Sequence, residues 1–165
     1  MNIYISQQNQ NQQKVPPLKM EGFEQTIYLY ETDRATDEDI TGIDQKAYEV
    51  IDATGTMKAP SFAVFNNIPV TEDGRSQFEK RFLNRARKIE HEPGFVAIRV
   101  CRPLHSDTYV VITLWKSQTD YEEWRQSSAY KHAHKKRGTS EGIDQQQPQI
   151  FPRPSFVETY HVSTT

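Results

Sequence analysis

The sequence has one cysteine, Cys101, and only seven glycines. A single cysteine cannot build a disulfide framework within the chain, and this usage is typical of proteins from a reducing cytosol. The sequence also lacks a glycine-rich phosphate loop and the Gly-x-Ser-x-Gly turn of serine hydrolases. Cys101 stands between Val100 and Arg102 in a strand-like run. We therefore expect a quiet structural thiol there and not a nucleophile.

Long apolar runs and a large net charge are also missing. No stretch approaches the roughly 18 to 20 apolar residues that cross a bilayer. Residues 1–13 show neither the basic nor the apolar region of a signal peptide. The formal net charge is −2, which argues against electrostatic binding of nucleic acid or anionic lipid. These absences predict a soluble cytoplasmic protein that binds neither nucleic acid nor membrane.

The second part of the chain has a readable order of elements. Residues 61–70 alternate like a strand, and a helix is predicted from apolar residues at spacings of four, four and three, namely Phe78, Phe82, Ala86 and Ile89. Residues 95–102 and 108–116 read as a hairpin. A capping box at residues 119–122 predicts a second helix, and residues 156–162 a last strand. The order strand, helix, strand, strand, helix, strand is that of a ferredoxin-like α+β unit.

The first part of the chain is rich in predicted strands, at residues 3–5, 26–30 and 48–51. We see no convincing helix before residue 70, so this part does not make a second complete unit. It can still supply sheet that pairs with the second part. We therefore divide the chain into a strand-rich N-terminal subdomain, residues 1–59, and a ferredoxin-like domain, residues 60–165.

Three residues of the second part stand out as candidates for chemistry. Asn66 shares its strand parity with apolar residues only, so it is expected to face the helices, whereas Asn67 is expected to face solvent. A buried amide needs a hydrogen-bond partner, and a structural bridge to the backbone would satisfy Asn66 equally well. Trp124 on the second helix reads as core when taken alone. His134 on the same predicted helix reads as a surface or core histidine when taken alone.

Other histidines and the basic residues are weaker candidates. His91, His105, His132 and His161 have no second candidate ligand on the same face beside them in sequence, so a dedicated zinc site is not indicated. Residues 131–137 hold several lysines and an arginine. They would attract anions such as haem propionates or phosphates, or they form a solvated helix end that the helix dipole favours.

The order and spacing of several short runs resemble the antibiotic biosynthesis monooxygenase (ABM) superfamily. These runs are Asn66-Asn67-Ile68-Pro69-Val70, Phe78-Glu79-x-Arg81-Phe82, Glu92-Pro93-Gly94-Phe95 and Thr113-x-Trp115-x-Ser117, followed by Trp124 and His134. Within the superfamily the chain is similar to IsdG-type haem-degrading monooxygenases of the longer bacillus type, which carry an N-terminal extension. The resemblance covers residues 60–162 well and the extension recognisably.

The resemblance implies a function and a role for each candidate. His134 takes the position of the axial ligand of haem iron, and Trp124 that of the residue that presses on the porphyrin and distorts it. Asn66 or Asn67 takes the position of the family's asparagine, which hydrogen-bonds the oxygen bound to iron, and strand parity favours Asn66. Haem is then both substrate and cofactor, and O₂ with an external electron donor, a reductase or a small reductant, opens the ring and releases iron.

Two other functions remain open. The first is a non-enzymatic signalling or stress protein resembling target of RNAIII-activating protein, in which the catalytic residues are missing. The second is a cofactor-free ABM oxygenase that acts on a quinol or a polyketide. Short ABM proteins dimerise into a β-barrel, because an exposed apolar sheet face associates. Here we expect the extra N-terminal strands to replace the partner, giving a monomeric pseudo-dimer with one haem site.

Overall fold

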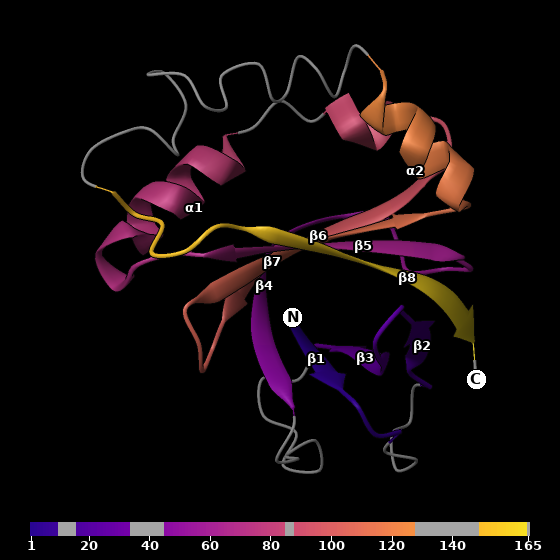
Figure 1. Cartoon of the computed structure of the whole chain (residues 1–165), viewed down its shortest axis with the longest axis horizontal. Helices are drawn as coiled ribbons and strands as arrows, with labels where there is room; N and C mark the ends of the chain where they lie inside the picture. The colour runs from indigo at the N-terminus through magenta and orange to yellow at the C-terminus, as the bar shows by residue number, and fades with distance from the viewer. Residues whose placement is uncertain (10–15, 34–44, 85–87, 128–148, 165) are drawn as a thin grey trace.

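In the part of the chain that the structure describes, the architecture is a closed barrel of eight antiparallel strands with two α-helices on its outer face (Figure 1). A computed structural model describes residues 1–9, 16–33, 45–84, 88–127 and 149–164. The strands in these ranges are β1 (Asn2–Ser6), β2 (Leu18–Glu21), β3 (Thr26–Thr32), β4 (Lys46–Thr54), β5 (Phe62–Pro69), β6 (Phe95–Pro103), β7 (Thr108–Trp115) and β8 (Phe156–Thr164). The helices are α1 (Arg75–Leu83) and α2 (Gln118–Arg125).

The two halves of the barrel have the same strand order. Around the barrel the first four strands run β4-β1-β3-β2 and the last four run β8-β5-β7-β6. In each half the fourth strand therefore lies beside the first, then come the third and the second, which is the ferredoxin-like order. The N-terminal strands thus form a half-repeat of the C-terminal unit, and the expected α+β fold with a pseudo-dimeric barrel is confirmed.

Two seams join the halves, and they are equivalent. At one seam β2 pairs with β8, from Leu18 opposite Thr164 to Glu21 opposite His161. At the other seam β4 pairs with β6, from Tyr48 opposite Pro103 to Thr54 opposite Ile98, with a bulge between Val50 and Asp52. Each seam joins the second strand of one half to the fourth strand of the other. This reciprocal pairing is the relation that two subunits would have across a two-fold axis.

The barrel interior is filled by side chains from alternate positions of every strand. Its core is apolar and comes from both halves, with Ile3, Met20 and Leu29 packed against Ile112 and Leu114. Cys101 lies in this core and is fully buried, and burial raises the pKa of its thiol. The expectation of an unreactive structural cysteine agrees with this position.

A buried ion pair crosses the barrel interior between the halves. Arg99 of β6 donates from Nε to a carboxylate oxygen of Glu31 of β3 at 2.6 Å. The Arg99 side chain is 5% exposed, and its guanidinium also donates to the carbonyls of Thr54 and Ile98. The pair therefore ties the N-terminal half to the C-terminal half in a place from which water is largely excluded.

Both helices lie on the outer face of the C-terminal half (Figure 1). Phe78 and Phe82 of α1 pack over a cluster that includes Val100, Tyr109 and Val111. Thr71 accepts a hydrogen bond from the Gly74 backbone and so caps the turn before α1, as its position in the sequence suggests. The C-terminal half therefore has a sheet face that is covered by helices, and its other face lines the barrel.

Three details of the sequence interpretation need correction. Strand β2 escaped prediction, because its four residues alternate too briefly to give a signal. The cap of α2 is Ser117 and not Thr119: Ser117 is extended and its side chain accepts from the Asp120 backbone. Helix α1 ends at Leu83, and Ile89 lies in a separate 3₁₀ turn, Lys88–His91.

Within the described ranges, no helix has the length and apolar character needed to span a membrane.

Candidate functional site

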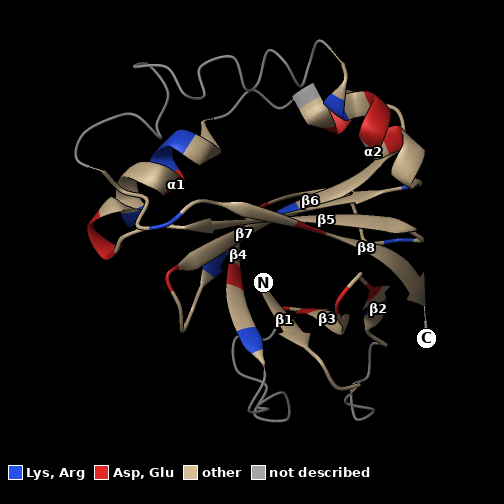
Figure 2. Ribbon diagram, viewed as in Figure 1, with Lys and Arg blue, Asp and Glu red and all other residues tan. Residues whose placement is uncertain are grey.

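The outer face of β5 changes from apolar to polar and back along its length. Phe62 and Val64 belong to the cluster that α2 covers, and Ile68 and Val70 to the cluster that α1 covers. Asn66 lies between these pairs on the same face, because side chains of a strand alternate. The expected orientation of Asn66 toward the helix side is therefore observed. No charged residue occurs in β5, whereas α2 carries three acidic ones (Figure 2).

The surroundings of Asn66 combine a polar group with uncovered apolar surface. Asn66 pairs with Val111 on one side and with Val157 on the other. Val157 is 57% exposed, and at this position β8 pairs with β5 alone, since its pairing with β2 covers only His161 to Thr164. The Asn66 amide makes no hydrogen bond with any residue in the described part of the chain. This face offers an amide and apolar contacts to a molecule that lies on the sheet.

Trp124 borders the same face from the α2 side. Its ring centroid lies 5.5 Å from that of Trp115 and 6.1 Å from that of Tyr121, so the indole belongs to an aromatic cluster. Trp115 is fully buried, and its indole nitrogen donates to Thr113. The Ser117 cap fixes the start of α2 immediately after β7. Trp124 is thus held at one edge of the face on which Asn66 lies, as part of the α2 cluster and partly exposed.

His161 is a residue to which the sequence interpretation gave little weight. It pairs with Phe62, and their ring centroids lie 5.6 Å apart, so His161 lies on the outer face near the α2 cluster. The alternation of β8 could have placed it there. His134 and the basic residues 131–137 lie outside the described residues, so their predicted roles stay predictions.

Asn67 is not exposed to solvent, and that expectation is wrong. Its side chain is 4% exposed and donates to a carboxylate oxygen of Glu158 at 2.8 Å. The reason is that the N-terminal strands close the barrel over the inner face of β5, so Asn67 lies inside the barrel. The side chains of Asn66 and Asn67 therefore lie on opposite faces of β5.

The α1 side of the site is held by a charged cluster. Arg102 of β6 donates to Glu79 of α1 from Nε at 3.0 Å, and Tyr109 donates its hydroxyl to the same carboxylate. The hydrogen bond from Arg102 holds the pKa of Glu79 below its usual value of 4.5. Burial, followed by the bond to Glu79, raises the pKa of Tyr109. This cluster ties α1 to the sheet.

Comparison with known proteins identifies relatives of this chain. The antibiotic biosynthesis monooxygenase family profile matches residues 61–136. A haem-degrading monooxygenase of Halalkalibacterium halodurans is 31% identical over 83 residues, which cover 48% of this chain and 71% of that protein. A signal transduction protein TRAP of Staphylococcus epidermidis is 28% identical over 109 residues, or 65% of each protein. The match to TRAP thus spans a little under two thirds of its length.

Solved structures share the whole architecture. A structure described as a major regulator of staphylococcal pathogenesis superposes with a TM-score of 0.78 at 22% identity, covering 97% of this chain and 98% of the other. A haem-degrading enzyme from Listeria monocytogenes superposes with a TM-score of 0.65 at 15% identity, covering 98% and 99%. At these identities the likeness concerns the fold. The sequence matches show that this chain belongs to the antibiotic biosynthesis monooxygenase family.

Proposed function

We propose that this protein is a haem-degrading monooxygenase, which binds haem and uses O₂ and an external reductant to open the porphyrin and release iron. The observation that carries the proposal is the outer face of β5, where the Asn66 amide lies beside the exposed Val157 and near the α2 aromatic cluster. A flat apolar molecule with a reactive polar centre suits such a face. Related proteins described as haem-degrading monooxygenases support the same substrate.

Each proposed residue has a distinct task. His134 would ligate the haem iron, and residues 131–137 would attract the propionates. Trp124 would press on the edge of the macrocycle, since the packing of its ring against Trp115 and Tyr121 restricts its movement. Asn66 would donate a hydrogen bond to the reacting oxygen, because its amide has no other partner in the described part of the chain. Haem supplies the redox chemistry, and the protein supplies ligation, orientation and distortion.

The test compares two adjacent asparagines in turnover. With haem, ascorbate and O₂, the wild-type protein should bleach the Soret band and release iron that a ferrous chelator detects. Asn66→Ala should slow bleaching by roughly tenfold or more, the effect expected when one hydrogen bond to the reacting oxygen is lost, with little change in haem affinity. Asn67→Ala should bind and degrade haem at a rate near that of the wild type. Slow turnover in Asn67→Ala with normal turnover in Asn66→Ala would reverse the assignment.

A second candidate is a signalling protein without enzymatic activity. The TRAP proteins of Staphylococcus among the relatives favour it. The presence of Asn66, Trp124 and His134 favours the enzyme. The two functions are separated by haem titration, because a signalling protein of this kind would give no stoichiometric Soret shift.

We further propose that the protein acts in the cytoplasm and that it is a monomer, since both seams of its barrel are closed within one chain.

A further inference from the structure

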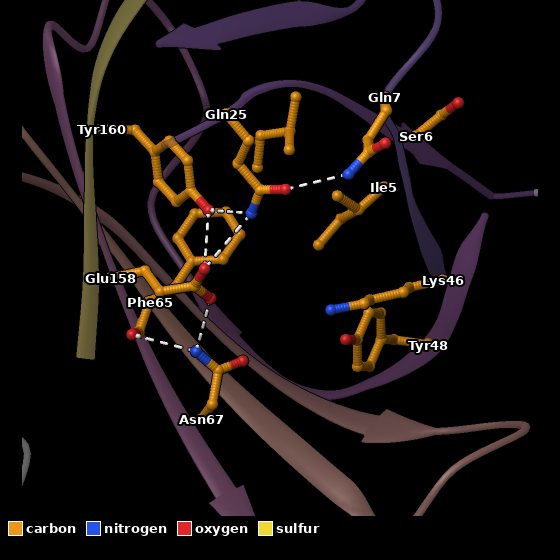
Figure 3. A pocket seen from close by; sticks show the side chains of 11 residues that line it. Ile5, Ser6, Gln7, Gln25, Lys46, Tyr48, Phe65, Asn67, Glu158 and Tyr160 are labelled. Atoms are coloured by element: carbon orange, nitrogen blue, oxygen red, sulfur yellow. Dashed lines mark hydrogen bonds between the residues drawn. The ribbon is translucent and has the colours of Figure 1, made fainter. Parts of the chain in front are cut away.

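The barrel interior opens at one end into a pocket that is separate from the outer face of β5. The pocket is partly open to solvent. It is lined by residues of both halves, and Asn67, the inward neighbour of Asn66, lies at its edge (Figure 3). The pocket and the proposed haem site therefore lie on opposite faces of the same strand.

One wall of the pocket is a closed hydrogen-bond network around Glu158. The carboxylate accepts from Asn67 at 2.8 Å, from the Tyr160 hydroxyl at 3.0 Å and from Gln25 at 3.3 Å. Gln25 also donates to the Tyr160 hydroxyl at 3.0 Å and accepts from Gln7 at 3.0 Å. A carboxylate offers about four acceptor positions. Three are in use, so the network leaves room for one more donor and none for a second anion.

The opposite wall presents two donors that have no partner among the described residues. The Lys46 ammonium and the Tyr48 hydroxyl point into the pocket across from the Glu158 network (Figure 3). Tyr48 is only 4% exposed. Neither group makes a hydrogen bond or an ion pair with any residue in the ranges that the structure describes. Both donors line the open pocket, so an acceptor that enters it can bind them.

Between the two walls the lining is apolar. Ile5, Ile27 and Phe65 contribute it, and Phe65 packs edge-on against Tyr160 with ring centroids 5.0 Å apart. A ligand that fits all three features has a carboxylate at one end, a small apolar body and a single hydrogen-bond donor at the other end. An ammonium and a hydroxyl together suit a carboxylate, because hydrogen bonds to an ionised group are the strong ones.

We propose that this pocket binds a small hydroxylated organic monocarboxylate, with its carboxylate on Lys46 and Tyr48 and its hydroxyl on Glu158. Haem is excluded from this role, because the side chains of both halves fill the barrel behind the pocket. The site draws residues from the N-terminal strands, so it exists only in the closed barrel.

The test uses three matched probes on the full-length protein: 4-hydroxybenzoate, benzoate and phenol. Calorimetry should show saturable binding of 4-hydroxybenzoate, with benzoate weaker and phenol weakest. Lys46→Met and Tyr48→Phe should each weaken 4-hydroxybenzoate by about tenfold or more, as expected for loss of a charge-assisted hydrogen bond. Lys58→Met is the matched control, because Lys58 is exposed like Lys46 but lies between β4 and β5 and does not line the pocket; this variant should bind like the wild type.

Several results would overturn the proposal. They are the absence of saturable binding by 4-hydroxybenzoate, equal affinity for all three probes, or unchanged affinity in Lys46→Met and Tyr48→Phe. Tyr48→Phe removes one oxygen from a position that already lacks a partner, so this variant should fold. A thermal unfolding midpoint close to that of the wild type verifies this, and its binding result then decides the question.

Discussion

The buried ion pair between Arg99 and Glu31 allows the closure of the barrel to be tested by one substitution. Glu31→Gln keeps the shape of the side chain and removes its charge, which leaves the Arg99 guanidinium inside the barrel without its counter-ion. Removing one partner of a buried pair costs about 3 to 5 kcal/mol in general. Here Glu31 is 23% exposed and Arg99 keeps its bonds to two carbonyls, which lowers the cost. We expect a loss of about 2 to 3 kcal/mol in the free energy of unfolding.

The assay is urea unfolding followed by circular dichroism, with thermal unfolding beside it. For a chain of this size the loss corresponds to a decrease of about 4 to 12 °C in the melting temperature. A double variant, Glu31→Gln with Arg99→Met, should recover most of the loss, because no unpaired charge is then buried. The control is Glu21→Gln, which breaks the exposed pair with Lys19 and should change stability by less than about 1 kcal/mol. A loss in Glu31→Gln no larger than in this control would refute the account.

Three further predictions concern other parts of the chain. The Cys101 thiol should resist a disulfide reagent such as DTNB in the folded protein and react at once in denaturant, because burial removes access and raises its pKa. The bond to Arg102 lowers the pKa of Glu79, so the unfolded state binds more protons on this group than the folded state. The free energy of unfolding should therefore decrease as pH falls below about 4.5. Glu79→Gln should flatten this part of the profile of stability against pH. The full-length protein should run as a monomer near 19.2 kDa in light scattering. Deletion of residues 1–55 should give dimers or aggregates, because it uncovers the inner face of the strands β5, β6, β7 and β8.

The elements that sequence alone could predict are those with a strong local signal. The strands β5, β6 and β7 are runs of eight or nine residues that are mostly apolar, and turn residues bound the hairpin of β6 and β7, so each run reads as a strand. Strand β2 has only four residues, and its identity comes from pairing with β3 and β8 at positions far away in sequence. No local pattern contains that information. The prediction of the α2 cap was wrong for a related reason. Ser117 and Thr119 are both residue types that cap helices, and only the extended backbone of Ser117 distinguishes them.

The sequence likewise predicts one part of the candidate site and misses another. Parity placed Asn66 on the helix face, because the neighbours Val64 and Ile68 identify that face as apolar. The same parity misled for Asn67, because a sheet with one covered face normally exposes the other. The closed barrel buries both faces, and this follows from the N-terminal strands and not from β5. The network around Glu158 was invisible in sequence for the same reason, since Gln25 and Asn67 meet there only when the barrel closes.

The central claim is that this chain binds haem through His134, and a haem titration tests it most directly. Haemin added to the purified full-length protein should shift the Soret band with a break at one equivalent per chain. His134→Ala should lose most of this binding, while His132→Ala, two residues away in the same basic segment, should titrate like the wild type. A Soret spectrum and stoichiometry in His134→Ala that equal those of the wild type would contradict the claim, and His132 would then be the next ligand to test.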